Sequence, residues 1–237
     1  MIEYALVPIS FVTSCVAGAL GLGGGVLLIA LMPGLVPAAA ILPLHALVQL
    51  GSNGSRAALR PGLIHWRLVP ALVAGAVAGA ALGGGVYASL DLSWLPAVVG
   101  VLILLITWIP LPPVRGGGQW GLMLLGFYQT GIGMVAGATG PLGAAVLARF
   151  NVERDWLVVN TAVYMSINHL LRVLAFALLG FSFAPWWPLL LGMIAAAIAG
   201  SWVGTRLRAH IPQGDFQRWF RLLVTVLALR MIVLPWL

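Results

Sequence analysis

Polar residues that could bind an ion lie inside two otherwise apolar stretches of the chain, residues 37–59 and residues 155–180. The first stretch offers His45, Gln49, Ser52, Asn53 and Arg56, and the second offers Thr161, Asn168, His169 and Arg172. The spacing i, i+4, i+7 puts Gln49, Asn53 and Arg56 on one face of a helix. Buried polar groups in a membrane are costly and usually face a cavity or the interior of a helix bundle. The pattern therefore predicts a polar face that lines a cavity.

The two arginines of these stretches are the most informative of the polar residues. A guanidinium keeps its charge and binds oxyanions through forked hydrogen bonds. The five acidic residues all lie near the ends of apolar stretches, so none is expected to neutralise Arg56 or Arg172. A small anion is therefore the expected substrate. The alternative is that both side chains extend to lipid headgroups.

Enzyme signatures are absent from the sequence, which has no HExxH, GxSxG, Walker or CxxC motif and no paired carboxylates inside an apolar stretch. The four histidines show no paired helical spacing within one stretch. We therefore expect no enzymatic activity, no cofactor and no metal site. His45 could carry a coupling proton, because imidazole titrates near neutrality, or it could only form a hydrogen bond between helices.

Glycines cluster at two places where the chain is otherwise apolar enough to cross a membrane. We expect the helix to break there, because glycine is a poor helix former. The unwound backbone would then expose amide groups that attract anions. The alternative is close packing of unbroken helices against small residues. The predicted substrate site also includes residues of these two clusters, namely Gly21, Gly23, Gly24, Gly25, Gly137, Thr139 and Gly140.

The composition identifies an integral membrane protein. Apolar residues make up 62% of the 237 residues and charged residues only 7%, whereas a soluble domain carries about 25% charged residues. The apolar runs are continuous rather than alternating, so we expect spanning helices and no strands. The net charge of +7 comes from arginines, which apart from those of the polar face lie mostly between these runs or near their ends, as is typical of orientation signals in cytoplasmic loops. We expect the lipid bilayer as a partner and no nucleic acid.

The apolar stretches form two groups of four, with approximate bounds 4–33, 37–59, 65–89 and 93–112, then 118–149, 155–180, 184–205 and 217–236. An offset of 116 residues places Gly21 on Gly137, Gly24 on Gly140, and Arg56 on Arg172. We therefore predict a duplication into two membrane units, residues 1–114 and residues 115–237.

Charge indicates that the two units are inverted. Basic residues in 56–67 and 206–221 mark loops on the cytoplasmic side. Both loops lie on that side only if stretch 118–149 enters and leaves the membrane on one side, as a re-entrant hairpin. By repeat logic, stretch 4–33 is the mirror hairpin. The predicted fold is all-α, with six full spans, two glycine-broken hairpins and both termini outside. The alternative is eight plain spans.

The sequence resembles the TauE/SafE sulfite exporter family, also called TSUP. The resemblance rests on "GALGLGGGVLLIALMP", on the second glycine segment "GMVAGATGPLGAAVL" and on a repeat at about half the length. It implies a bacterial inner-membrane transporter of small sulfur-containing anions such as sulfite. The family's glycine motif falls on Gly18, Gly21, Gly23, Gly24, Gly25, Gly133, Gly137, Gly140 and Pro141. Thr161 matches a small polar position of the family, and His45 departs from it in the first half.

Together these features predict a secondary transporter, in the direction of export, that moves a small anion by alternating access between inverted repeats. An anion channel, a carrier of a non-sulfur anion, and an assembly protein without a permeant are the alternatives. The identity of a coupling ion, proton or sodium, stays open at this point.

Overall fold

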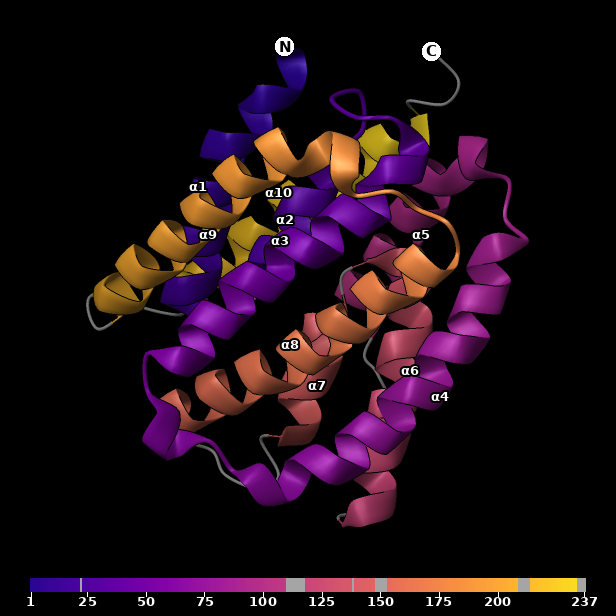
Figure 1. Ribbon diagram of the computed structural model, residues 1–237. Coiled ribbons are helices and arrows are strands. Elements are labelled where there is room, and N and C mark those ends of the chain that lie inside the picture. Colours follow the sequence, from indigo (N-terminus) through magenta and orange to yellow (C-terminus); the bar gives the residue numbers. More distant parts are fainter. Residues whose placement is uncertain (22, 110–117, 138, 148–152, 209–213, 234–237) are drawn as a thin grey trace.

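The computed structural model describes residues 1–21, 23–109, 118–137, 139–147, 153–208 and 214–233, and the regular elements of these residues are helices (Figure 1). They are α1 (Leu6–Leu20), α2 (Gly24–Leu31), α3 (Ala38–Ala58), α4 (Val69–Ala88), α5 (Leu95–Trp108), α6 (Gln119–Ala136), α7 (Gly140–Leu147), α8 (Arg154–Leu178), α9 (Trp187–Leu207) and α10 (Gly214–Val233). Short 3-10 turns precede several of them. Part of the predicted basic loop 206–221 lies outside the described residues.

The surface and interior are those of a membrane protein, which confirms the predicted class. Four helical segments of the described residues are long and apolar enough to cross a bilayer, namely Ile2–Leu20, Trp66–Ala88, Arg154–Leu178 and Ala184–Leu207. Large apolar side chains such as Leu82 and Leu191 are exposed, whereas polar side chains such as Gln49 are buried. This distribution is stable in lipid, because apolar side chains can face acyl chains without cost.

Both glycine clusters interrupt a helix. α1 ends at Leu20, and Gly21 then takes a φ of 89° before α2 begins at Gly24. α6 ends at Ala136, and Gly137 takes a φ of 77° before α7 begins. Left-handed backbone of this kind is readily available only to glycine. The residue type therefore explains why the chain leaves the helix at these two points.

The short helix after each break lies beside the helix before it. A Cβ atom at Gly24 would lie 2.1 Å from the Thr13 carbonyl oxygen of α1, so α2 begins against the middle of α1. In the second half, the Gln129 side chain of α6 donates a hydrogen bond to the Thr139 carbonyl, and the Thr139 hydroxyl donates to the Gln129 carbonyl at 3.3 Å. In both halves the chain therefore turns back on itself after the glycine.

Helices from different halves pack in pairs. Gly200 and Gly204 of α9 lie against Phe11 and Cys15 of α1, in the same order along both helices, so α1 and α9 run parallel. α4 and α6 are parallel in the same way, with Gly75 against Met123 and Gly79 against Phe127. Glycine permits these backbone approaches because it has no side chain between the helices.

Two further helix pairs complete the bundle. α3 and α8 cross in opposite directions, with His45 beside His169 and Gly54 beside Ser166. α5 and α10 are also antiparallel, and Trp108 Nε1 donates a hydrogen bond to the Thr225 hydroxyl at 2.8 Å. The start of α1 and the end of α10 lie at the same, upper end of the molecule in Figure 1.

Candidate functional site

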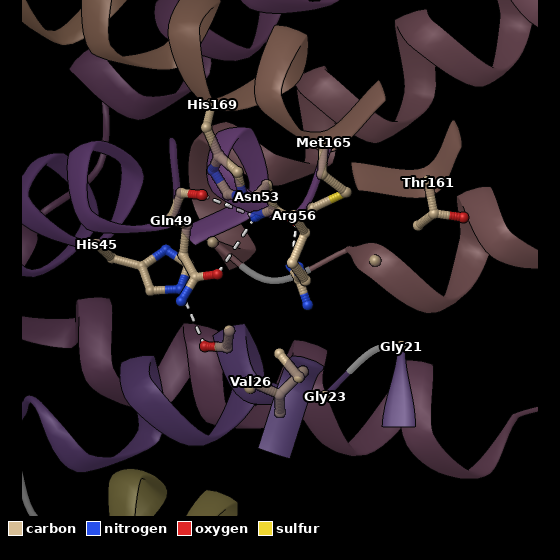
Figure 2. A pocket seen from close by; sticks show the side chains of 15 residues that line it. Gly21, Gly23, Val26, His45, Gln49, Asn53, Arg56, Thr161, Met165 and His169 are labelled. Atoms are coloured by element: carbon tan, nitrogen blue, oxygen red, sulfur yellow. Dashed lines mark hydrogen bonds between the residues drawn. The ribbon is translucent and has the colours of Figure 1, made fainter. Parts of the chain in front are cut away.

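A small pocket lies where the two glycine breaks meet α3 and α8 (Figure 2). Its cavity volume is about 40 Å³, and a single water needs roughly 10–15 Å³ on the same measure. The pocket therefore has room for only a few non-hydrogen atoms. The predicted site residues that line it are Gly21, Gly23, Gly24, Gly25, His45, Gln49, Asn53, Arg56, Gly137, Gly140, Thr161 and His169.

Many of the lining residues form pairs across the predicted repeat. The offset of 116 residues relates Gly21 to Gly137, Gly24 to Gly140, His45 to Thr161, Gln49 to Met165, and Asn53 to His169, and all of these line the pocket. Sequence reasoning missed Met165 because it is apolar, and also missed Ala17 and Val26. For Met165 a signal existed, because it is the repeat partner of Gln49.

Arg56 brings a charge into the pocket without an opposite charge from the protein. Its side chain is 6% exposed, and the ion pairs of the described residues do not include it. Its Nη2 donates a hydrogen bond to Asn53 Oδ1, while Nε and Nη1 have no partner although they are buried. A buried cation in this state is costly, so the site favours an anion that supplies the missing acceptors.

The hydrogen bonds around Arg56 leave donors free rather than acceptors. Arg56 donates to Asn53, and the Asn53 amide nitrogen in turn donates to Gln49 Oε1 at 3.4 Å and to the Gln49 carbonyl at 2.8 Å (Figure 2). The Gln49 Nε2 group at the end of this chain is buried without a partner, as is the Thr161 hydroxyl. A chain that runs in one direction orients each amide, so the free group at the end of this chain is a donor, which suits an oxyanion.

The glycine break before α2 adds backbone donors. Gly24, Gly25 and Val26 lie in the first turn of α2 and line the pocket. The amides of a first helical turn have no partner within the helix, and together with the helix dipole they attract negative charge. The site thus combines a guanidinium, free amide donors and a helix start.

Arg172, the repeat partner of Arg56, does not line the pocket. It is fully buried, and its Nη1 donates a hydrogen bond to the Gly137 carbonyl at 2.8 Å and lies 3.2 Å from His169 Nδ1. Its Nε and Nη2 have no partner. Arg172 therefore holds the carbonyl that is freed at the second glycine break, one layer behind the pocket.

Three other predicted site residues also point elsewhere. The Ser52 hydroxyl lies 2.9 Å from the Ser201 hydroxyl of α9. The Thr139 hydroxyl donates a hydrogen bond to the Gln129 carbonyl of α6, and Asn168 is buried beside Gly133 of the same helix. Their contacts join helices instead of lining the pocket.

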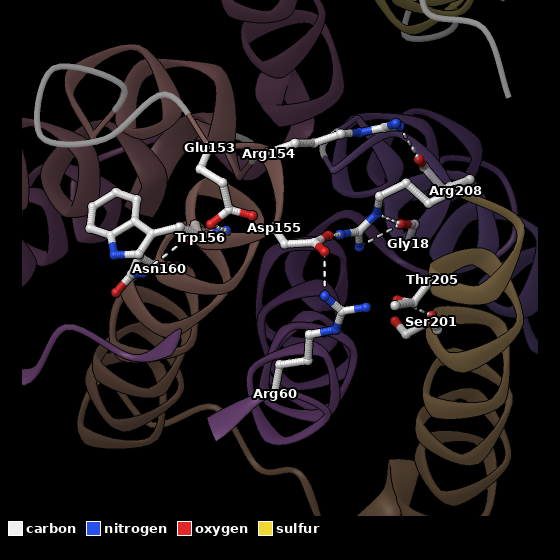
Figure 3. Close-up of polar contacts among 11 residues, drawn as sticks. Gly18, Arg60, Glu153, Arg154, Asp155, Trp156, Asn160, Ser201, Thr205 and Arg208 are labelled. Atoms are coloured by element: carbon white, nitrogen blue, oxygen red, sulfur yellow. Dashed lines mark hydrogen bonds and ion pairs between the residues drawn. The ribbon is translucent and has the colours of Figure 1, made fainter. Parts of the chain in front are cut away.

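Arginines from other elements donate hydrogen bonds to carbonyl groups in the last turn of α1, just before the first glycine break (Figure 3). Arg208 donates to the Gly18 carbonyl from Nε at 3.0 Å and from Nη2 at 2.9 Å, and Arg154 donates to the Ala19 carbonyl at 3.2 Å. Asp155 pairs with Arg208 at 2.9 Å and also with Arg60. Burial lowers the pKa of Arg208, and the charge of Asp155 opposes this shift. Sequence reasoning treated these residues as orientation signals only.

Among the described residues, no group of three histidine, cysteine or acidic side chains comes together as a metal site would require. A family model described as "Sulfite exporter TauE/SafE" matches residues 6–231, nearly the whole chain. Neither a curated protein nor a solved structure matches the chain.

Proposed function

The chain belongs to the TauE/SafE sulfite exporter family, whose members are anion transporters and not enzymes, and from this premise we propose that it is a secondary transporter that exports sulfite or a related small sulfur oxyanion. The predicted site residues that line the pocket bind the anion. We further propose that the protein lies in the bacterial inner membrane, with the end of α9 and its arginines on the cytoplasmic side.

The single observation that carries this proposal is the state of Arg56. It is a buried cation with two free nitrogens, beside further free donors, in a pocket that no acidic side chain of the described residues lines. A neutral or cationic substrate would leave the charge uncompensated. A forked guanidinium binds two oxygens of an oxyanion at once.

The dimensions of the pocket support a small substrate. The cavity volume of about 40 Å³ corresponds to a few water-sized positions. Sulfite, with one sulfur and three oxygens, is of this size. The surrounding glycines leave backbone amides within reach of such an ion, because no side chain stands in front of them.

We propose that alternating access arises from two inverted repeats, residues 1–114 and 115–237, whose boundary lies outside the described residues. Exchanging the halves turns the parallel pair α1–α9 into the parallel pair α6–α4, and it maps α3 onto α8 and α5 onto α10. These relations support the inverted arrangement of the two repeats. The six spans of the proposal are α3, α4, α5, α8, α9 and α10, and the hairpins α1–α2 and α6–α7 enter from opposite sides. Rocking of one repeat against the other would then expose the pocket to each side in turn.

The test is exchange of radiolabelled sulfite in proteoliposomes, with Arg56→Gln as the variant. We expect exchange to fall about tenfold or more, because a hydrogen bond to a charged group is worth roughly 1.5–3 kcal/mol. Arg67→Gln serves as the matched control, since Arg67 is exposed in the turn Trp66–Leu68 and does not line the pocket. If the Arg56→Gln variant has normal thermal stability and exchanges sulfite at the wild-type rate, Arg56 does not belong to the substrate site.

A further inference from the structure

Two histidines face each other across the pocket from the two central helices. The rings of His45 on α3 and His169 on α8 lie 5.8 Å apart at an interplanar angle of 74°. Both side chains are buried and both line the pocket. The hydrogen bond that each ring makes decides which of its nitrogens carries the proton, and the two rings differ in this respect.

The contact with Arg172 fixes the protonation of His169. The guanidinium Nη1 lies 3.2 Å from His169 Nδ1, and a guanidinium can only donate hydrogen bonds. His169 Nδ1 is therefore the acceptor, and the neutral ring carries its proton on Nε2. A proton added to Nδ1 would set two donors against each other and would break the contact with Arg172. His169 is thereby held neutral.

His45 is arranged in the opposite sense. Its Nε2 lies 2.9 Å from the Gly25 carbonyl oxygen, which can only accept, so Nε2 carries the proton. The other nitrogen, Nδ1, then has a lone pair, and it is buried without a hydrogen-bond partner. This lone pair would repel an oxyanion in the pocket unless a proton lay between them.

We propose that His45 Nδ1 is the binding site of a proton that crosses the membrane together with the anion. The inference rests on the function proposed above. A proton from the aqueous side binds to the Nδ1 lone pair, the new N–H donates a hydrogen bond to an oxygen of the anion, and both leave to the same side. Because doubly charged sulfite and one proton together carry a net negative charge, an inside-negative membrane potential drives the pair out of the cell, while a pH gradient with acid outside drives it inward. The anion and the proton bind cooperatively, because each neutralises the charge that the other would leave buried.

The charges around His45 make the proton depend on the anion. α8 contributes the neutral ring of His169 and the cation Arg172, and α3 itself contributes Arg56, so both charged neighbours are cations. α2 contributes no titratable side chain, α1 only Cys15, and the turn Leu92–Trp94 none beyond the exposed Asp91 that caps it. The arginine of α9, Arg206, lies at the end of that helix beside Trp202. An unaccompanied proton on His45 would meet only like charge.

The experiment compares two modes of radiolabelled sulfite uptake into proteoliposomes, each corrected with protein-free vesicles and with the membrane potential clamped. The first is exchange at equal pH. The second is net uptake driven by a pH gradient of one unit, acid outside. With one proton per anion, wild-type protein should accumulate sulfite about tenfold, since one pH unit is a tenfold difference in proton activity.

His45→Gln is the decisive variant, because glutamine can still donate to the Gly25 carbonyl but cannot titrate. We expect slower exchange at equal pH and no accumulation in response to the gradient, whereas His65→Gln, on an exposed residue outside the pocket, should behave as wild type. Wild-type protein that exchanges sulfite but ignores the gradient would overturn the inference alone. Gradient-driven accumulation by His45→Gln would also overturn it. Wild-type protein without any exchange would overturn the proposed function itself.

Discussion

At the scale of the residue, the direction of hydrogen bonds matters more than the presence of polar groups. The chain from Arg56 through Asn53 to Gln49 begins with a donor that carries charge and ends with a donor that is free. A site for a cation built from the same residue types would need free oxygens instead. The amide orientation set by Arg56 therefore makes this part of the pocket complementary to negative charge.

Gln49→Met tests this preference, because methionine has a similar volume and stands at the matching place of the second half, as Met165. We expect the apparent affinity for sulfite to weaken about fivefold, since a neutral hydrogen bond is worth roughly 1 kcal/mol. The measurement is the concentration dependence of sulfite exchange.

Ser52→Ala is the control for Gln49→Met. Its hydroxyl contacts Ser201 of α9 and does not line the pocket, so its removal should lower thermal stability slightly without changing the affinity for sulfite. An affinity that is weaker in Ser52→Ala than in Gln49→Met would contradict the role of Gln49 as a donor to the anion.

At the scale of the element, each half of the molecule depends on a helix that ends inside the bundle. The carbonyl groups freed at these ends are held by arginines of distant elements: Arg208 and Arg154 hold those of α1, and Arg172 holds that of Gly137. Freed carbonyls carry partial negative charge at the end of a helix, which explains why cations meet them. The helix breaks and the three arginines that bind the freed carbonyl groups therefore depend on each other.

Gly24→Ala tests the turned-back arrangement of α2. The new methyl carbon would lie 2.1 Å from the Thr13 carbonyl oxygen and 2.7 Å from the Ala17 Cβ, so α2 must move away from α1. We expect a loss of thermal stability of about 1–3 kcal/mol, as for other overpacked positions, together with loss of sulfite exchange. The stability is measured by thermal unfolding in detergent.

Gly85→Ala provides the comparison for Gly24→Ala, because Gly85 is helical and nothing lies within 4 Å of its Cβ position. This variant should be as stable as wild type or slightly more so, since alanine is the better helix former. Equal stability of the two variants would be incompatible with close contact between α1 and α2.

At the scale of the whole molecule, the two arginines that the predicted repeat pairs make different contacts. Arg172 binds the Gly137 carbonyl, whereas Arg56 faces the pocket and does not bind Gly21. If the halves exchange conformations during transport, the opposite state should have Arg56 on the Gly21 carbonyl and Arg172 in the pocket. The different contacts of the two arginines would then identify which of the two conformational states of the transport cycle the structure represents.

Arg172→Gln distinguishes this exchange from a static role. We expect equilibrium binding of sulfite to the solubilised protein to stay within about threefold of wild type, a difference of less than 1 kcal/mol. Turnover in proteoliposomes should fall much further, and Arg172→Lys, which keeps the charge, should restore part of it. A parallel loss of binding and turnover would show that Arg172 belongs to the pocket in this state as well.

The sequence by itself determined the class of protein and the places where its helices break. Composition and continuous apolar runs specify a helical membrane protein, and only glycine readily adopts the backbone found at Gly21 and Gly137. The glycine segments likewise indicated the family, and the match over residues 6–231 shows it. The inverted repeats and their hairpins remain a prediction that the helix pairing supports.

Only the tertiary structure decided which of the polar residues share a pocket. Helical spacing tells which side chains lie on one face, but not which neighbouring helix that face meets. Ser52 faces α9 and Arg172 faces the end of α6, while the apolar Met165 lines the pocket opposite α3. These outcomes depend on how each helix is rotated and crossed against the others, because packing of the whole bundle sets those angles and no local pattern records them.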